Sequence, residues 1–126
     1  MADRRLALPA LLCAFLACCT PAPGPAAKLT MADIAPILTP LTYRELLGAK
    51  CGEPNMAVKT AFMVDLKAAG APDALLAEAA AEAARIETEE RDTPNEYVCT
   101  AELYESTEEN AAAAQKAWDE LKIRKS

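Results

Sequence analysis

The cysteines are the residues of this chain whose number and spacing say most about its chemistry. The 126-residue sequence has five of them and no histidine. Cys13, Cys18 and Cys19 lie near the N-terminus, whereas Cys51 and Cys99 lie far apart in the remainder. Two isolated thiols form neither a Cys-x-x-Cys redox motif nor a zinc site. An even pair in an exported chain is normally a disulfide, so we predict a structural Cys51–Cys99 bridge that stabilises the fold by roughly 4 kcal/mol.

No catalytic arrangement can be assembled from the other side chains. Without histidine the chain lacks the usual general base and the commonest metal ligand, and its serines, Ser106 and Ser126, have no activating partner. The sequence has no phosphate-binding glycine loop and no calcium-binding loop spacing. We therefore predict a non-enzymatic protein with no catalytic residue, no metal site and no cofactor. The formal charge of −6 argues against nucleic acid as a partner.

The N-terminal residues have the pattern of an export signal. Two arginines and then an uncharged apolar stretch occupy residues 4–17, and this stretch is too short to span a bilayer as a helix. We predict a signal peptide over 1–19. The segment 15–19 resembles a bacterial lipobox, which makes Cys18 and Cys19 the candidate lipidation sites. The alternative is ordinary cleavage, for example after Cys19, with no lipid attached.

A proline- and alanine-rich segment over 20–29 is typical of an extended tether, and the remaining residues 30–126 are expected to form one helical domain. Removal of the leader takes away Arg4, Arg5 and Asp3, so the formal charge changes from −6 to about −7. A single acyl chain would hold such a domain at a membrane surface without a transmembrane helix. We expect a location in the bacterial cell envelope, either periplasmic or lipid-anchored.

Proline and glycine divide the rest of the chain into segments whose apolar residues have helical rather than strand spacing. We expect helices over 39–47, 53–69 and 72–91, because a proline lies at or near the start of each and Gly48 and Gly70 follow two of the ends. Any helical turn before these segments is expected to be short, because another proline interrupts it.

Two capping boxes predict the starts of two further helices. One lies at 93–96, with Pro94 at the first helical position, and the other at 106–109. The last helix has acidic residues at its start and basic residues at its end, which complements the helix dipole. The predicted fold class is therefore all-α: a small bundle of four to five short helices stapled by one disulfide.

One apolar stripe on each longer helix is expected to form a thin core. The stripes are Val58, Phe62, Leu66 and Ala69; Leu75, Ala79, Ala83 and Ile86; and Ala111, Ala114, Trp118 and Leu121. Large side chains are few, so we also expect the following aromatic residues in the core: Tyr43, Tyr97, Tyr104 and Trp118.

Carboxylates form two runs whose members are Glu87, Glu89, Glu90 and Asp92, and Glu102, Glu105, Glu108 and Glu109. The plain interpretation is a solvated surface that aids solubility. The alternative is a response to acid, because clustered carboxylates repel one another and are protonated earlier as the pH falls. Their neutralisation would leave the domain strongly basic, which could split a dimer or expose an apolar face.

Three features resemble the HdeA-type periplasmic acid-stress chaperones: the wide Cys51–Cys99 separation, the Cys99-Thr100 dipeptide, and the tryptophan-led C-terminal segment Trp118–Lys122 with its lysine-rich tail. The resemblance covers roughly residues 40–125. It implies a homodimer that dissociates in acid and whose exposed monomer surface holds unfolding client proteins.

The residues themselves favour a different main expectation. A small acidic domain behind a lipobox-like leader indicates a membrane-tethered envelope accessory, that is, a lipoprotein that binds a protein partner through a helix face. The acid-responsive chaperone is the alternative. A change of oligomeric state with pH separates it from the first, which predicts lipid attachment at Cys18 or Cys19.

Overall fold

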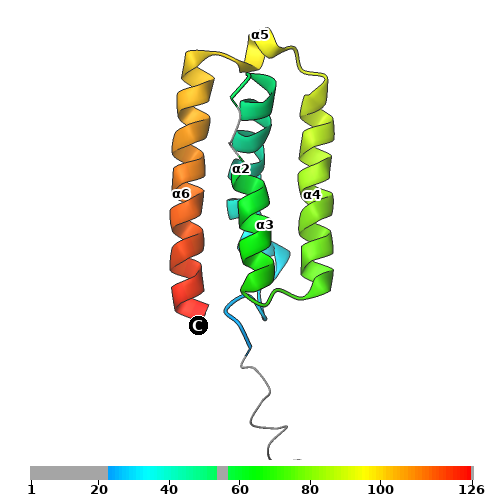
Figure 1. Cartoon of the computed structure of the whole chain (residues 1–126), viewed down its shortest axis with the longest axis vertical. Helices are drawn as coiled ribbons and strands as arrows, with labels where there is room; N and C mark the ends of the chain where they lie inside the picture. Colours follow the sequence, from blue (N-terminus) through cyan, green and yellow to red (C-terminus); the bar gives the residue numbers. More distant parts are fainter. Residues whose placement is uncertain (1–22, 54–56, 126) are drawn as a thin grey trace, which may run out of the picture.

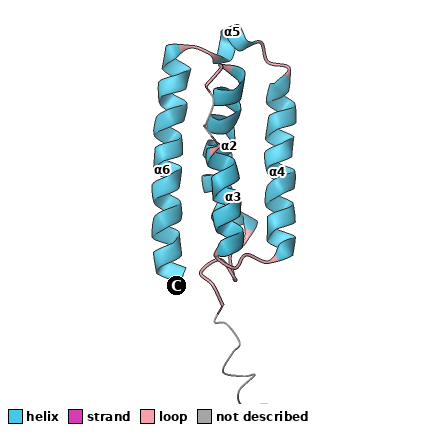
Figure 2. Cartoon of the chain, viewed as in Figure 1, coloured by secondary structure: helices cyan, strands magenta, loops and turns pink. Residues whose placement is uncertain are grey.

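The structure is a computed structural model in which residues 23–53 and 57–125 are described. All regular structure in these residues is helical (Figure 2). The helices are α2 (Met31–Lys50), α3 (Val58–Ala68), α4 (Asp73–Arg91), α5 (Asn95–Val98) and α6 (Ala101–Lys125). The predicted all-α bundle with one disulfide is confirmed.

Helix α2 is the centre of the bundle. It packs against α3, α4 and α6, whereas α3 makes its other main contact with α4. Figure 1 shows α2 behind α3, with α4 and α6 on opposite sides and the short α5 across one end. The C-terminus of α6 and the start of the described chain lie at the other end. Each of the other long helices therefore packs against α2.

Helix α2 is longer than the sequence pattern predicts, because it runs through Pro36 and Pro40. Each proline removes one helical hydrogen bond, to the carbonyls of Ala32 and Pro36 respectively. Both of those residues are exposed, so water can satisfy the freed oxygens. Four large buried side chains on the inner face of this stretch stabilise the helix in spite of the prolines: Ile34, Ile37, Leu38 and Leu41.

Two glycines with positive φ angles end helices in this bundle. Gly70 (φ 93°) follows α3 as predicted, and the N–H of Ala71 donates to the carbonyl of Leu66 at 3.2 Å. Gly52 (φ 79°) follows α2 in the same way, with the N–H of Glu53 donating to the carbonyl of Gly48 at 2.8 Å. Gly48 was expected just beyond the helix, but it lies inside α2.

Of the two predicted capping boxes, only the first lies at the start of a helix. The first segment forms only the four residues of α5, and its N-cap is Pro94 rather than Thr93. The second box lies inside α6, which begins at Ala101. At that start, the hydroxyl oxygen of Thr100 accepts a hydrogen bond from the N–H of Leu103 at 3.2 Å. The hydroxyl of Thr107 instead donates to the carbonyl of Leu103. The same residue types that cap a helix are tolerated on its solvated face.

The core is thin and alanine-rich, as expected, and the three predicted stripes are buried apart from partly buried Val58. Trp118 is completely buried and meets the ring of Phe62 edge-on at 5.1 Å. The prediction of buried tyrosines is wrong for Tyr43 and Tyr97, which are 38% and 68% exposed, and Tyr104 is only partly buried. Their rings extend beyond the narrow core that the alanines leave.

The described part of the predicted tether is not extended. Residues 25–28 form a turn, and Ala26 and Leu29 are buried in the core. The N–H of Ala26 donates to the carbonyl of Ala69 at 2.9 Å, and a Cβ on Gly24 would lie 2.1 Å from that same oxygen. The folded domain therefore begins before residue 30, because Gly24 lets the backbone approach the end of α3 closely.

Candidate functional site

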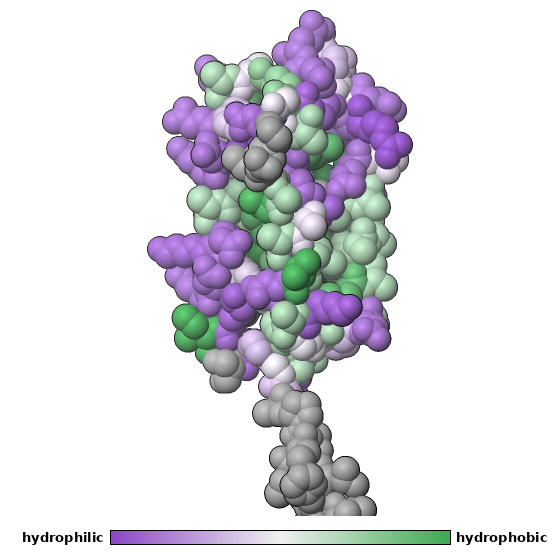
Figure 3. All heavy atoms as spheres, in the orientation of Figure 1, coloured by the Kyte–Doolittle hydropathy of each residue, from purple (hydrophilic) through white to green (hydrophobic). Residues whose placement is uncertain are grey.

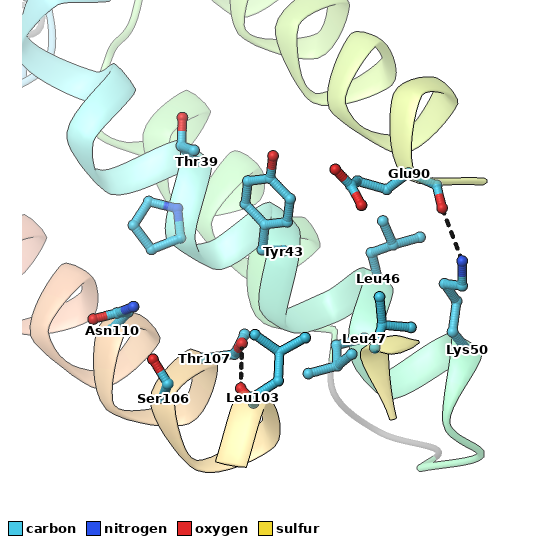
Figure 4. A pocket seen from close by; sticks show the side chains of 12 residues that line it. Thr39, Tyr43, Leu46, Leu47, Lys50, Glu90, Leu103, Ser106, Thr107 and Asn110 are labelled. Atoms are coloured by element: carbon cyan, nitrogen blue, oxygen red, sulfur yellow. Dashed lines mark hydrogen bonds between the residues drawn. The ribbon is translucent and has the colours of Figure 1, made fainter. Parts of the chain in front are cut away.

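An apolar groove of about 400 Å³ lies at the α5 end of the bundle (Figure 4). Its floor is the face of α2 on which Thr39, Tyr43, Leu46 and Lys50 recur at helical spacing. The ends of α4 and α5 and the first turns of α6 supply the walls. The full lining is Thr39, Pro40, Tyr43, Leu46, Leu47, Lys50, Glu90, Val98, Leu103, Ser106, Thr107 and Asn110.

Two large apolar side chains of this groove are exposed to solvent. Tyr43 is 38% exposed and Leu103 is 39% exposed, and Figure 4 shows them on facing elements, α2 and α6. Leu46 and Val98 are half-buried, and Leu47 is buried beneath them. These side chains form one apolar surface that the fold itself does not cover.

Lys50 fixes the position of α4 beside the groove. Its Nζ donates to the carbonyls of Glu90 at 2.8 Å and Thr93 at 2.5 Å, which are at the C-terminal end of α4. This end of a helix carries partial negative charge, so the ammonium group is favourably placed. Because Lys50 donates to these carbonyls, it supports the wall of the groove rather than offering its protons to a ligand.

The disulfide lies next to the groove at its α5 end, because its chain neighbours Lys50 and Val98 line the groove. Cys51 directly follows α2 and Cys99 directly follows α5, and their Cα atoms are 5.5 Å apart. The amide of Asn95 adds a hydrogen bond to the carbonyl of Lys50 at 3.1 Å. Val98, next to Cys99, lines the groove. The predicted bridge is thus confirmed, and it holds α5 against the end of α2.

The carboxylates near the C-terminal end of α4 differ in their partners. On α4, Glu87 pairs with Lys59 at 3.1 Å and Glu89 pairs with Arg85 at 2.6 Å. Glu90 lines the groove and has no ion pair within the described residues. Figure 3 shows the face that carries α3 rather than the groove, and there hydrophilic residues predominate near the α5 end and hydrophobic ones in the middle.

The acidic run on α6 has no ion pair among the residues that the structure describes. Glu102 and Glu109 lie four residues before and three residues after Ser106, so they neighbour this lining residue on the helix surface. The groove is therefore apolar inside and negatively charged along its α6 edge.

A second polar cluster joins α2 to α6 next to the disulfide. Arg44 is 2% exposed, and its Nη2 donates to the hydroxyl of Tyr104 at 2.6 Å and lies 3.6 Å from a carboxylate oxygen of Glu53. Tyr104 donates to the same carboxylate, and this hydrogen bond raises the pKa of Tyr104. The guanidinium also lies 4.5 Å from the centre of the Tyr104 ring. The cluster fastens α6 to the turn after α2.

At the other end of the bundle, Asp65 links α3 to α6. The indole N–H of Trp118 donates to its Oδ2 at 2.6 Å, and the ammonium of Lys122 donates to the same oxygen at 2.7 Å. The hydrogen bonds from Lys122 and Trp118 lower the pKa of Asp65. This arrangement satisfies the polar edge of a buried tryptophan and serves packing.

The lipidation candidates Cys18 and Cys19 lie outside the described residues. Within residues 23–53 and 57–125, no group of cysteine and carboxylate side chains is arranged to hold a metal ion. Among the described helices, none combines the length and apolar composition needed to cross a bilayer.

Sequence reasoning missed the groove, although one signal was present. Tyr43 and Leu46 lie on the side of α2 opposite its buried stripe, so this helix has more apolar residues than one core-facing stripe requires. Comparison of the chain with family models, with curated proteins and with solved structures gave no match. The inference of function therefore rests on the groove and the charges around it.

Proposed function

We propose that this protein is a non-enzymatic accessory of the bacterial cell envelope that is tethered to a membrane by lipid and binds a protein partner in the apolar groove. The observation that carries the proposal is the groove itself, an uncovered apolar surface with Tyr43 on its α2 floor and Leu103 on its α6 wall. Exposed apolar hollows with polar rims are typical of interaction sites. The hydroxyl and amide groups of Ser106 and Asn110 at the edge suit hydrogen bonds to a bound chain.

The position of the groove is consistent with a tether at the N-terminus. The described chain begins at the end of the bundle opposite α5, where α6 also ends with basic side chains. A lipid on Cys18 or Cys19 would hold that end at the membrane, and Lys122, Arg124 and Lys125 would be attracted to anionic headgroups there. The groove would then lie at the far end of the domain, accessible to a partner.

Photocrosslinking in the native envelope tests partner binding. A photoreactive amino acid in place of Leu103 samples the groove, and the same replacement of Val64, which is 67% exposed on α3, is the matched control. We expect a discrete crosslinked protein from position 103 and none from position 64. The same bands from both positions, or no band from either, would contradict the proposal.

Lipid attachment has its own test. We expect the wild-type chain to incorporate labelled palmitate and to fractionate with membranes. Replacement of both Cys18 and Cys19 by alanine should abolish both properties, because no other cysteine follows a lipobox-like segment. A soluble, unlabelled wild-type protein would show that the leader is removed by ordinary cleavage.

An acid-responsive chaperone is the second candidate, and the observation that favours it is the combination of an apolar groove with an edge of carboxylates that lack ion pairs within the described residues. Protonation of that edge would make the groove less polar at its rim. Light scattering between pH 7 and pH 2 tests this candidate. A single unchanged oligomer over that range, together with no protection of an acid-unfolded client, would remove it.

A further inference from the structure

We infer that the partner segment bound by the groove is a basic amphipathic helix, whose apolar face fills the groove and whose lysine or arginine side chains lie against the acidic α6 edge. This inference rests on the proposed function and adds the chemistry of the partner to it. It is carried by the shape of the groove and by the charges at its edge.

The shape fits a helix. The lining residues of α2 extend from Thr39 to Lys50, which corresponds to three helical turns and a length of about 16 Å. On α6, which runs antiparallel to α2, the lining extends beside it from Leu103 to Asn110. A long apolar trough between two helices accepts the anchors of an amphipathic helix at positions i, i+3 or i+4, and i+7.

The charges select a basic helix. Glu102 and Glu109 border Ser106 on the α6 wall, and Glu90 lines the α4 wall. Lys50 contributes one positive charge at the rim, but its Nζ is held against the carbonyls at the end of α4. Carboxylates beside an apolar floor attract a cationic side chain whose stem packs on that floor.

The same charges disfavour two other occupants. A second copy of this chain would bring together two domains that each carry a formal charge of about −7, and like charges across an interface are unfavourable. An anionic lipid surface would be repelled by the acidic wall for the same reason. A basic amphipathic segment of another protein satisfies both the apolar and the charged parts of the site.

Fluorescence anisotropy with synthetic peptides tests this inference. The protein is purified from cells that express the full chain, after those cells have processed its leader. The probe is a labelled helix of about 14 residues with leucines at the anchor positions and lysines beside them. The matched peptide has glutamate at every lysine position. We expect the lysine peptide to bind, to bind more weakly as salt is added, and to bind at least about tenfold more tightly than the glutamate peptide.

Pairs of variants show where on the protein the lysine peptide binds. Glu102→Gln with Glu109→Gln should weaken the lysine peptide about fivefold at low salt, whereas Glu78→Gln with Glu120→Gln changes the net charge equally and should have no effect. Both control residues are exposed and lie outside the groove. Leu103→Ser should weaken the lysine peptide by more than about tenfold because it removes an apolar wall.

Each of the remaining outcomes would overturn a different part of the inference or of the proposed function. Equal binding of the glutamate peptide would overturn the basic partner while the groove remains a protein-binding site. Equal effects of the two glutamate pairs would show that net charge, rather than the groove edge, attracts the peptide, and would also overturn the inference. A dimer of the protein alone that Leu103→Ser dissociates would assign the groove to a second copy. If Leu103→Ser leaves peptide binding unchanged and the photoreactive residue at position 103 gives no specific crosslink in the envelope, the proposed function fails as well.

Discussion

The two ends of this bundle are held together by different means. At the end where the described chain begins and α6 ends, Trp118 fills the core, meets Phe62 edge-on and donates its indole N–H to Asp65. At the α5 end, the disulfide, the Lys50 contacts with carbonyls of α4 and the Arg44 cluster join the helices. One end is stabilised by side-chain packing, and the other by a covalent bond and polar contacts.

This difference has a consequence for binding. The groove at the α5 end leaves Tyr43, Leu46 and Leu103 at least partly uncovered, so they can contact a partner. A small domain has little apolar surface to divide between stability and binding, and removing a disulfide from one typically costs about 2–5 kcal/mol. The staple therefore allows the groove to exist in a domain with a thin core.

The largest effect is expected at the packed end, on Trp118→Ala. This change leaves a large cavity beside Phe62 and should lower the free energy of unfolding by about 3–5 kcal/mol. Urea denaturation followed by circular dichroism measures it. Tyr97→Ala, at a site that is 68% exposed, is the control and should change the stability by less than about 0.5 kcal/mol. Similar losses in the two variants would contradict the assignment of the core.

Removal of the disulfide should come next. Replacement of Cys51 and Cys99 together by alanine should cost about 2–4 kcal/mol. Amide hydrogen exchange should become faster in α5 and the first turns of α6, with little change around Trp118 until the protein unfolds globally. Exchange that accelerates uniformly over both ends would show that the disulfide does not act on the groove end specifically.

The stability in acid should depend on Asp65. Lys122 and Trp118 lower its pKa in the folded state, so its contribution is complete above the unfolded value of about 3.9 and is lost as the pH falls through the lower folded value. Because the carboxylate is 42% exposed, we expect Asp65→Asn to cost about 1 kcal/mol at neutral pH. The difference from wild type should shrink in acid denaturation curves measured below pH 4. A difference that stays constant with pH would argue against the charged contact.

The smallest effect on stability is expected in the groove. Leu103→Ser changes a side chain that is 39% exposed and should alter the free energy of unfolding by less than about 1 kcal/mol. The same variant should lose partner binding. A groove variant that unfolds as readily as Trp118→Ala would mean that the groove is part of the core.

The buried stripes could be predicted from the sequence because each is a local pattern. Trp118, Phe62 and Ile86 recur with their neighbours at helical spacing, and burial follows from that spacing once the helices form. The Cys51–Cys99 disulfide could also be predicted from the sequence, because an even pair of cysteines in an exported chain is normally bridged. The continuation of α2 through Pro36 could not be predicted from the sequence, because the tertiary packing that stabilises it involves helices remote in sequence.

The groove could not be predicted because it belongs to several segments together. Its walls come from α2, α4, α5 and α6, and their arrangement depends on where each helix begins. The motif at 106–109 suggested a helix start, and that error placed Ser106 at a cap instead of on the wall of a groove. Local capping patterns also occur on exposed helix faces, so they do not by themselves fix a boundary.

A titration followed by amide NMR shifts tests the central claim most directly. The lysine peptide is added to the isotope-labelled protein, and the shifted amides are placed on the bundle. We predict that the shifts map to residues 39–50 of α2 and 103–110 of α6, with none around Trp118 and Asp65. Shifts centred on Trp118, or scattered over both ends, would contradict a division of the bundle into a packed end and a binding end.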